Sequence, residues 1–143
     1  MTAKTSVFIF VTCLCLIVST QAVKVDGPGQ AENESTNILT GTVTAIYSRI
    51  TRDAFYEWNH CVAAVRIESI QKGEGLKTGD LIFVRYISSN RWIGKGEMPP
   101  GPGGHNNVPG EGERRKVCLN KNADGGLDVY YVSGFKAADD KKP

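Results

Sequence analysis

Few of the residue types on which catalytic and metal sites depend occur in this 143-residue sequence, which has only two histidines and four cysteines. It contains no Ser-centred nucleophile elbow, phosphate-binding loop or paired catalytic carboxylate motif. Charges of both signs are mixed along the chain, and the formal net charge is only +2. Nucleic-acid binding requires a clustered basic surface. These absences argue against an enzyme and against nucleic acid as a main partner.

Long apolar runs are also absent, except near the N-terminus. There Lys4 precedes an apolar run over residues 7–18, and Thr20 and Ala22 occupy the small-residue positions of a signal peptidase site. The run is shorter than the roughly 20 residues that a membrane-spanning helix needs. We interpret residues 1–22 as a secretory signal peptide. This predicts a secreted, periplasmic or cell-envelope protein with no stable membrane insertion after the signal is removed.

The mature chain predicted in this way keeps 121 of the 143 residues and two of the four cysteines. It loses one of 17 basic residues, so 16 remain against 15 acidic ones, a formal charge of +1. Residues 23–37 are polar and lack periodicity, which predicts a flexible leader, and residues 136–143 predict a disordered tail in the same way. The intervening residues 38–135 suit one domain. We expect a monomer.

Helical periodicity of apolar residues is missing after the signal peptide, whereas β-type runs are frequent. An Asp-Gly step at 124–125 predicts a hairpin, and Gly41 can mark a β-bulge. Residues 51–59 fit either a short helix or a loop. Runs rich in β-branched or alternating apolar residues predict strands at 38–50, 60–70, 81–88, 114–120 and 127–132.

Five short strands are too few for a sandwich, and closure into a barrel removes exposed edges. We therefore predict an all-β fold, a small five-stranded OB-like barrel over residues 38–135. The Gly/Pro-rich segment 94–113 then lies between the third and fourth strands. It has four prolines and no serine, unlike a flexible spacer, so we predict an ordered loop lying over the barrel.

Two stretches carry a resemblance to known families. Residues 65–86, VRIESIQKGEGLKTGDLIFVRY, are similar to the middle of exported OB-like domains, including the netrin-like modules to which tissue inhibitors of metalloproteinases belong. Residues 92–135 resemble a group of small uncharacterised exported proteins from planctomycete-type bacteria. The resemblance implies a fold more than an activity. Those inhibitors chelate the protease zinc with an N-terminal cysteine, which has no counterpart here because the predicted mature chain begins at Val23.

The two remaining cysteines can pair or stay separate. In an oxidising compartment two cysteines usually form a disulfide, and closing this loop would stabilise the fold by about 4 kcal/mol. Alternation places Cys61 with the apolar residues of its strand, but it turns Cys118 away from Val117 and Leu119. That difference in facing disfavours a bridge. Both alternatives stay open.

His105 supplies the competing hypothesis of a metal-binding protein or enzyme. Zinc sites need at least three ligands, and His105 with Cys118 and a carboxylate such as Glu111 or Glu113 is the set that the sequence offers. A loop histidine bonded to nearby carbonyl groups is the commoner situation. We therefore predict no metal and no cofactor.

Aromatic residues give the strongest functional signal. Phe55, Tyr56 and Trp58 lie within 51–59, and Trp92 begins the long loop. Such rings either plug the ends of a barrel or form a platform for sugars or Pro-rich peptides. We predict an exported, non-catalytic binding or accessory module for a protein, peptide or glycan, with a purely structural envelope-associated domain as the other alternative. The predicted contact residues are Trp58, Arg91, Trp92 and His105.

Overall fold

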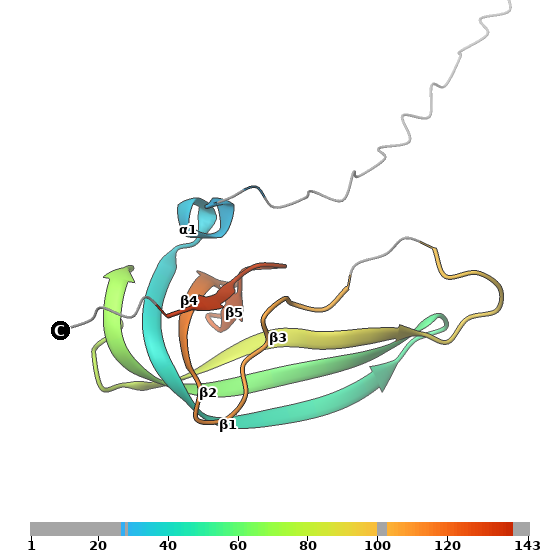
Figure 1. The fold of residues 1–143 in the computed structure, drawn as a ribbon, viewed down its shortest axis with the longest axis horizontal. Helices are drawn as coiled ribbons and strands as arrows, with labels where there is room; N and C mark the ends of the chain where they lie inside the picture. Colours follow the sequence, from blue (N-terminus) through green and yellow to red (C-terminus); the bar gives the residue numbers. More distant parts are fainter. Residues whose placement is uncertain (1–26, 28, 100–102, 139–143) are drawn as a thin grey trace, which may run out of the picture.

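Strands dominate the described part of the chain (Figure 1). In this computed structural model, residues 27, 29–99 and 103–138 are described. The predicted signal peptide and the last five residues of the predicted tail lie outside them. Within the described ranges, no helix is long and apolar enough to cross a membrane.

All five predicted strands are present, and a sixth follows them. The first three are longer than predicted, because their pairing continues to a common tip. The elements are α1 (Gln30–Glu34), β1 (Asn37–Arg52), β2 (Tyr56–Lys72), β3 (Leu81–Trp92), β4 (Arg114–Lys121), β5 (Leu127–Val129) and β6 (Phe135–Ala137).

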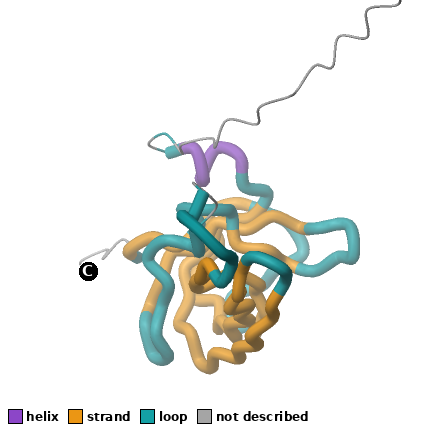
Figure 2. Tube along the Cα trace, turned by 90° about the vertical axis from the view of Figure 1, so that its right-hand side faces the viewer, coloured by secondary structure: helices purple, strands orange, loops and turns teal. Residues whose placement is uncertain are grey.

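Five of these strands close into a ring (Figure 2). β1 pairs antiparallel with both β2 and β4, β2 pairs antiparallel with β3, and β5 joins β3 in parallel and β4 antiparallel. The order around the ring is therefore β1-β2-β3-β5-β4 and back to β1. β6 adds to β4 outside this order. The all-β prediction is confirmed.

The first three strands extend beyond the ring as a three-stranded sheet (Figure 1). At its tip, Arg52 lies opposite Glu57, and Tyr56 lies opposite Trp92. The predicted helix or loop over 51–59 is therefore wrong, since only residues 53–55 lie between β1 and β2. The physical reason is that one carboxylate oxygen of Asp53 accepts hydrogen bonds from the N–H groups of Phe55 and Tyr56, at 2.8 and 2.6 Å, which closes a tight turn.

Gly41 lies at an irregularity in β1, as predicted. The β1–β2 register shifts between Thr40 and Gly41. A Cβ atom at position 41 would lie 2.5 Å from the carbonyl oxygen of Arg66 on β2. Only glycine permits this close approach between the two backbones, which lets β1 change direction between the ring and the extension.

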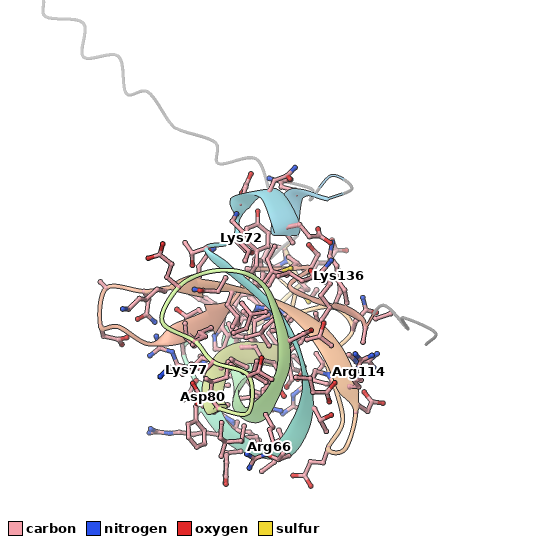
Figure 3. The ribbon with its side chains drawn as sticks, turned by 90° about the vertical axis from the view of Figure 1, so that its left-hand side faces the viewer. Arg66, Lys72, Lys77, Asp80, Arg114 and Lys136 are labelled. Atoms are coloured by element: carbon pink, nitrogen blue, oxygen red, sulfur yellow. The ribbon has the colours of Figure 1, made fainter. Side chains whose placement is uncertain are left out.

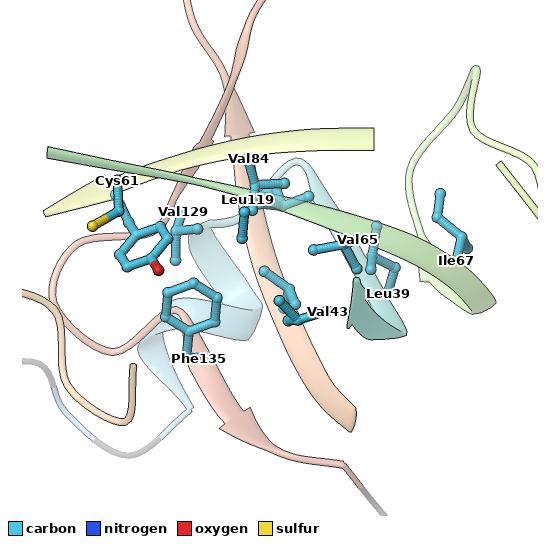
Figure 4. Packing of buried hydrophobic residues seen from close by; sticks show 12 residues of the cluster. Leu39, Val43, Cys61, Val65, Ile67, Val84, Leu119, Val129 and Phe135 are labelled. Carbon is cyan, nitrogen blue, oxygen red and sulfur yellow. The ribbon is translucent and has the colours of Figure 1, made fainter. Parts of the chain in front are cut away.

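The core fills the inside of the ring (Figure 4). Every strand contributes to it, including β6, whose Phe135 is fully buried. The ring of Phe135 packs edge-on against Tyr86, with centroids 5.1 Å apart. The side chains labelled in the close-up are Leu39, Val43, Cys61, Val65, Ile67, Val84, Leu119, Val129 and Phe135.

The predicted flexible leader and disordered tail are partly ordered, because they bind each other. Helix α1 covers one side of the sheet with Ala31 buried beneath it, and Glu32 forms an ion pair with Lys136 of β6. Figure 3 shows Lys72 and Lys136 on either side below α1, and the Lys72 ammonium donates to the carbonyl of Asn33. Residues 30–37 and 136–138, which belong to the predicted leader and tail, thus include secondary structure that contacts the rest of the domain.

Candidate functional site

One face of the extended sheet points away from the core and carries aromatic and cationic side chains. Cys61, Ala63 and Val65 of β2 face the core, so alternation turns His60 and Val62 to the other face. Directly opposed residues of antiparallel strands share a face, which places the partners of His60 and Val62 there too. We call this surface the outer face. It carries Tyr47, Arg49 and Thr51 on β1, Tyr56, Trp58, His60 and Val62 on β2, and Phe83, Arg85, Ile87, Asn90 and Trp92 on β3.

Contacts between side chains agree with this assignment. The Nε2 atom of His60 lies 3.0 Å from the hydroxyl of Thr51 on the neighbouring strand. Phe83 and Tyr47 are 54% and 60% exposed, respectively, although both sit on strands whose other face is core. The β2–β3 register shifts between Asn59 and His60. Ile87 on one side of this shift and Asn90 on the other therefore both lie on the outer face.

The tip of the outer face is a cluster of four aromatic rings, Phe55, Tyr56, Trp58 and Trp92, which we call the tip cluster. Phe55 stacks on Trp92 at 5.7 Å with planes 7° apart, and Tyr56 meets Trp92 edge-on at 5.1 Å. Tyr56 also contacts Trp58, at 5.3 Å. Trp92 is only partly buried and lies outside the core, so it packs the tip rather than plugging the ring.

Asp53 holds the tip cluster in place. Its second carboxylate oxygen accepts a hydrogen bond from the indole N–H of Trp58 at 2.8 Å. That bond contributes most to lowering the pKa of Asp53 below its ordinary value, and the hydrogen bonds from the N–H groups of Phe55 and Tyr56 lower the pKa further. The charged carboxylate therefore orients Trp58 and closes the turn at the same time.

We expect the tip cluster to change at acidic pH. Because the folded pKa of Asp53 is lowered, its contribution is complete above the ordinary Asp pKa and is lost as pH falls through the folded value. Tryptophan emission should stay constant from pH 7 to about pH 4 and change below it. Asp53→Asn should remove this transition. Asp80→Asn, at the other turn, where Asp80 accepts from the N–H of Lys77, should leave it unaltered; equal behaviour of the two variants would contradict the assignment.

Arg91 lies next to the tip cluster but on the opposite face. It forms an ion pair with Glu57 at 3.1 Å, and Glu57 also binds Arg52 at 2.6 Å. These three residues oppose one another across the strands, so alternation turns them away from Trp58. The structure thus brings Trp58 and Trp92 together and places Arg91 behind them.

Two adjoining hollows lie on the outer face between the tip cluster and the ring. The first has a volume of about 300 Å³, and the second, toward β5, about 340 Å³. His60 and Arg85 belong to both. The first hollow is lined mainly by Tyr47, Ser48, Arg49, Val62 and Tyr86, and the second by Ile87, His105, Asp128, Val129 and Tyr131.

Arg85 is fixed between two carboxylates. Its guanidinium binds Asp124 at 3.0 Å and Asp128 at 2.7 Å. These hydrogen bonds raise the pKa of Arg85, and the bond to Arg85 lowers the pKa of Asp124. The positive charge of Arg85 is therefore neutralised locally, and this group of three joins β3 to the β4–β5 hairpin.

His105 is a buried structural residue, only 8% exposed. Its Nδ1 lies 3.1 Å from the N–H of Ile87, and its Nε2 lies 3.1 Å from the carbonyl of Val129. With a proton on Nε2, the ring donates to the Val129 carbonyl and accepts from the Ile87 N–H at Nδ1, which also lies 3.1 Å from the Ile87 carbonyl. His105 forms part of the wall of the second hollow, but it joins β3 to β5 there. Ile87 precedes Trp92 by five residues on β3, or roughly 16 Å of strand, so His105 is not part of the tip cluster.

The structure places the two cysteines in separate clusters. Cys61 lies in the main core, whereas Cys118 lies in a second cluster with Ala31 and Ile38 beneath α1. Both are free thiols, because they face opposite sides of the sheet as alternation indicated. Burial raises the pKa of Cys118, which keeps it as an unreactive thiol. Among residues 29–99 and 103–138, no group of three or more His, Cys, Asp or Glu side chains is placed to hold a metal ion.

The sequence predictions did not include Tyr47, Arg49, His60 and Phe83, which lie on the outer face with Trp58 and Trp92. A signal for them was available, because alternation in 60–70 already placed alternate side chains away from the core. What was missing was the register, which sets Tyr47 beside Val62 and Arg49 beside His60. Comparison with known proteins adds no relative, since no family model, curated protein or solved structure matches this chain.

Proposed function

We propose that this protein is an exported, non-catalytic binding module whose outer face binds an extended ligand. One observation carries the proposal: partly exposed aromatic rings follow one another along a single face of a paired sheet. Tyr47 lies opposite Val62 of β2, and Trp92 lies opposite Tyr56 of β2. Val62 and Tyr56 are six residues apart, so the aromatic rings extend over about 20 Å of the sheet. Rings fixed in this way offer flat, amphipathic surfaces to a ligand at little entropic cost.

The order of the strands supports an OB-like assignment within this proposal. Pairing of β1 with both β2 and β4, and the parallel contact of β3 with β5, suit a five-stranded ring of OB type. In that fold the face of strands 2 and 3, with the loops after strands 1 and 4, is the usual ligand surface. Here those parts are the outer face, the Asp53 turn and the Asp124 hairpin. The netrin-like resemblance of residues 65–86 points the same way.

Export and a monomeric state belong to the same proposal. Export is supported by the features of residues 1–22, with their charged start, short apolar run and small-residue cleavage site. A monomer is supported by the ring, which pairs the edges of its strands within one chain, although among the described residues β1 and β3 have open edges where they extend beyond it. Size-exclusion chromatography with light scattering on the mature chain measures the second point directly.

The proposal is tested on the mature chain, residues 23–143, with Trp58→Ala and Trp92→Ala. We expect binding to at least one member of a panel of soluble polysaccharides and Pro-rich peptides, and a loss of tenfold or more in each variant. Each variant should lose only about 1 to 2 kcal/mol of unfolding free energy, because the tip lies outside the core. Isothermal titration and urea denaturation provide the two readouts.

The matched control is Ile50→Ala, which removes a 60% exposed apolar side chain from the other face of the same sheet, where Ile50 lies opposite Asn59. It should keep the affinity for the polysaccharide or peptide within twofold. If the wild-type chain binds no member of the panel, or if the two Trp variants bind as well as wild type, the proposal fails and a purely structural role replaces it.

A further inference from the structure

We propose that the ligand of the outer face is an acidic glycan, with a carboxylate or sulfate group of the glycan bound by Arg49. This inference rests on the proposed function and adds the chemical class of the ligand. It begins with the charges on and around the outer face. Most of these charged groups already have partners within the protein. The few charged groups without a partner therefore determine which ligand the outer face can attract.

The acidic groups near the outer face are engaged. Asp53 is held by Trp58 and by the N–H groups of its own turn. Glu57 lies on the opposite face between two arginines. Asp124 and Asp128 are both bound to Arg85. A negatively charged ligand on the outer face therefore meets no uncompensated carboxylate among these four.

Arg49 is the other arginine of the outer face, besides Arg85, which is already bound to two carboxylates. It is exposed, it lines the first hollow, and it has no ion pair within the described part of the chain. His60 lies directly opposite it on β2, and Tyr47 precedes it by two residues on the same face. A guanidinium presents a planar fork of donors that matches a carboxylate or sulfate with two parallel hydrogen bonds. The first hollow thus combines an anion-binding group with an exposed aromatic ring.

The spacing of charge on this face favours a glycan over a nucleic acid. A single nucleic-acid strand carries one negative charge per roughly 3.4 Å. Along the 20 Å of the aromatic face, such a strand would bring about six charges to one unpaired arginine. A glycan with one acidic group per repeat brings far fewer charges and presents sugar rings to the tip cluster. The formal net charge of the whole chain is only +2, which agrees with a ligand that carries few charges.

The position of the rings also favours a glycan over a peptide. Extended peptides commonly bind a sheet by adding a strand to its edge, where the backbone N–H and C=O groups are exposed. The aromatic rings and Arg49 project from the face of the sheet, whereas the open backbone groups of β1 and β3 point along its edges. Side chains alone contact a ligand there. A polymer of rigid rings suits that surface better than a flexible backbone does.

The test uses three acidic glycans, polygalacturonate, hyaluronate and chondroitin sulfate. Each carboxylated glycan is compared with its methyl-ester form, and chondroitin sulfate with its desulfated, esterified form. We expect the mature chain to bind at least one acidic form at least tenfold more tightly than its neutral form. Arg49→Gln should abolish this difference without weakening the neutral form, and Arg49→Lys should restore only part of it.

Lys77→Gln is the matched control, because it removes the same charge from the β2–β3 turn seen in Figure 3. It should retain the preference for the acidic form. Equal binding of acidic and neutral forms, or an equal effect of the two Gln variants, overturns the glycan inference while leaving the binding module intact. Preference for a dT₁₂ oligonucleotide or an Asp-containing Pro-rich peptide over every glycan also overturns it. Loss of binding in Trp58→Ala, tested in parallel, shows whether the proposed function itself holds.

Discussion

Replacing His105 by alanine is expected to lower the unfolding free energy by about 3 to 4 kcal/mol, a large part of the stability of a domain of this size. The substitution leaves the N–H of Ile87 and the carbonyl of Val129 without their ring partners in a buried place. Each such loss costs about 1 to 3 kcal/mol. It also leaves a cavity beside Tyr86, Tyr131 and Phe135, whose rings all surround the imidazole.

The size of this effect follows from where the ring of strands is weakest. β3 and β5 pair only through Val84 and Arg85, opposite Leu127 and Asp128. Beyond that point the strands diverge, and His105 connects them through its backbone N–H, which donates to Ile87 at 2.7 Å, and through its ring. The loop after β3 therefore acts locally as an inserted strand.

Two variants separate the polar and the packing parts of the effect, with urea denaturation as the measurement. His105→Phe fills the cavity but leaves both backbone groups unpaired, so we expect it to cost about 2 kcal/mol. His60→Ala removes the other histidine, which is exposed on the outer face, and should change stability by less than about 0.5 kcal/mol. Similar losses in His60→Ala and His105→Ala would contradict the structural role of His105.

The long Gly/Pro-rich loop gains a definite role from these contacts. Beyond His105, Val108 packs against the core, Glu111 accepts a hydrogen bond from the N–H of Ile46, and Gly112 donates to the carbonyl of Val43. The loop thus satisfies backbone groups on both β3 and β1. The prediction of an ordered loop over the ring agrees with these contacts for residues 103–113. Pro100, Gly101 and Pro102 lie outside the described residues.

Local patterns were enough to predict the strands but not what lies at their ends. Alternation and turn residues located β1 to β5, because a half-buried strand needs alternating side chains and a hairpin needs glycine at its turn. Helix α1 was missed because its five residues show no periodicity, and it is held instead by Ala31 under the helix and by Glu32, which binds Lys136. β6 was missed because a three-residue strand carries no pattern.

The candidate site was only partly predictable for the same reason. Trp58 and Trp92 were identified from their residue type, and the structure places them in one cluster. His105 and Arg91 were grouped with them by nearness in sequence to the two loops. The register instead turns Arg91 to the other face and draws His105 into the wall of the ring. The face of the sheet on which a side chain lies depends on how the strands pair, and the residue types alone do not reveal that pairing.

Phe135→Ala is expected to be the most damaging single substitution, with a loss of about 3 to 5 kcal/mol of unfolding free energy. Phe135 lies near the end of the chain, yet it is fully buried and meets both Tyr86 and His105 edge-on. Its strand β6 also places Lys136 where it binds Glu32 of α1. The substitution therefore opens a cavity in the core and weakens the contact between α1 and β6.

The matched control for this prediction is Phe83→Ala, which removes the same side chain from the outer face, where Phe83 is 54% exposed. We expect Phe83→Ala to change the unfolding free energy by less than about 1 kcal/mol and to weaken binding of the polysaccharide or peptide probe. Phe135→Ala should do the reverse wherever it still folds, with lower stability and unchanged affinity. Urea denaturation and titration calorimetry on both variants measure this. A stability loss in Phe83→Ala as large as that in Phe135→Ala would mean that Phe83 is covered in the folded protein, and the outer face could not be a free binding surface.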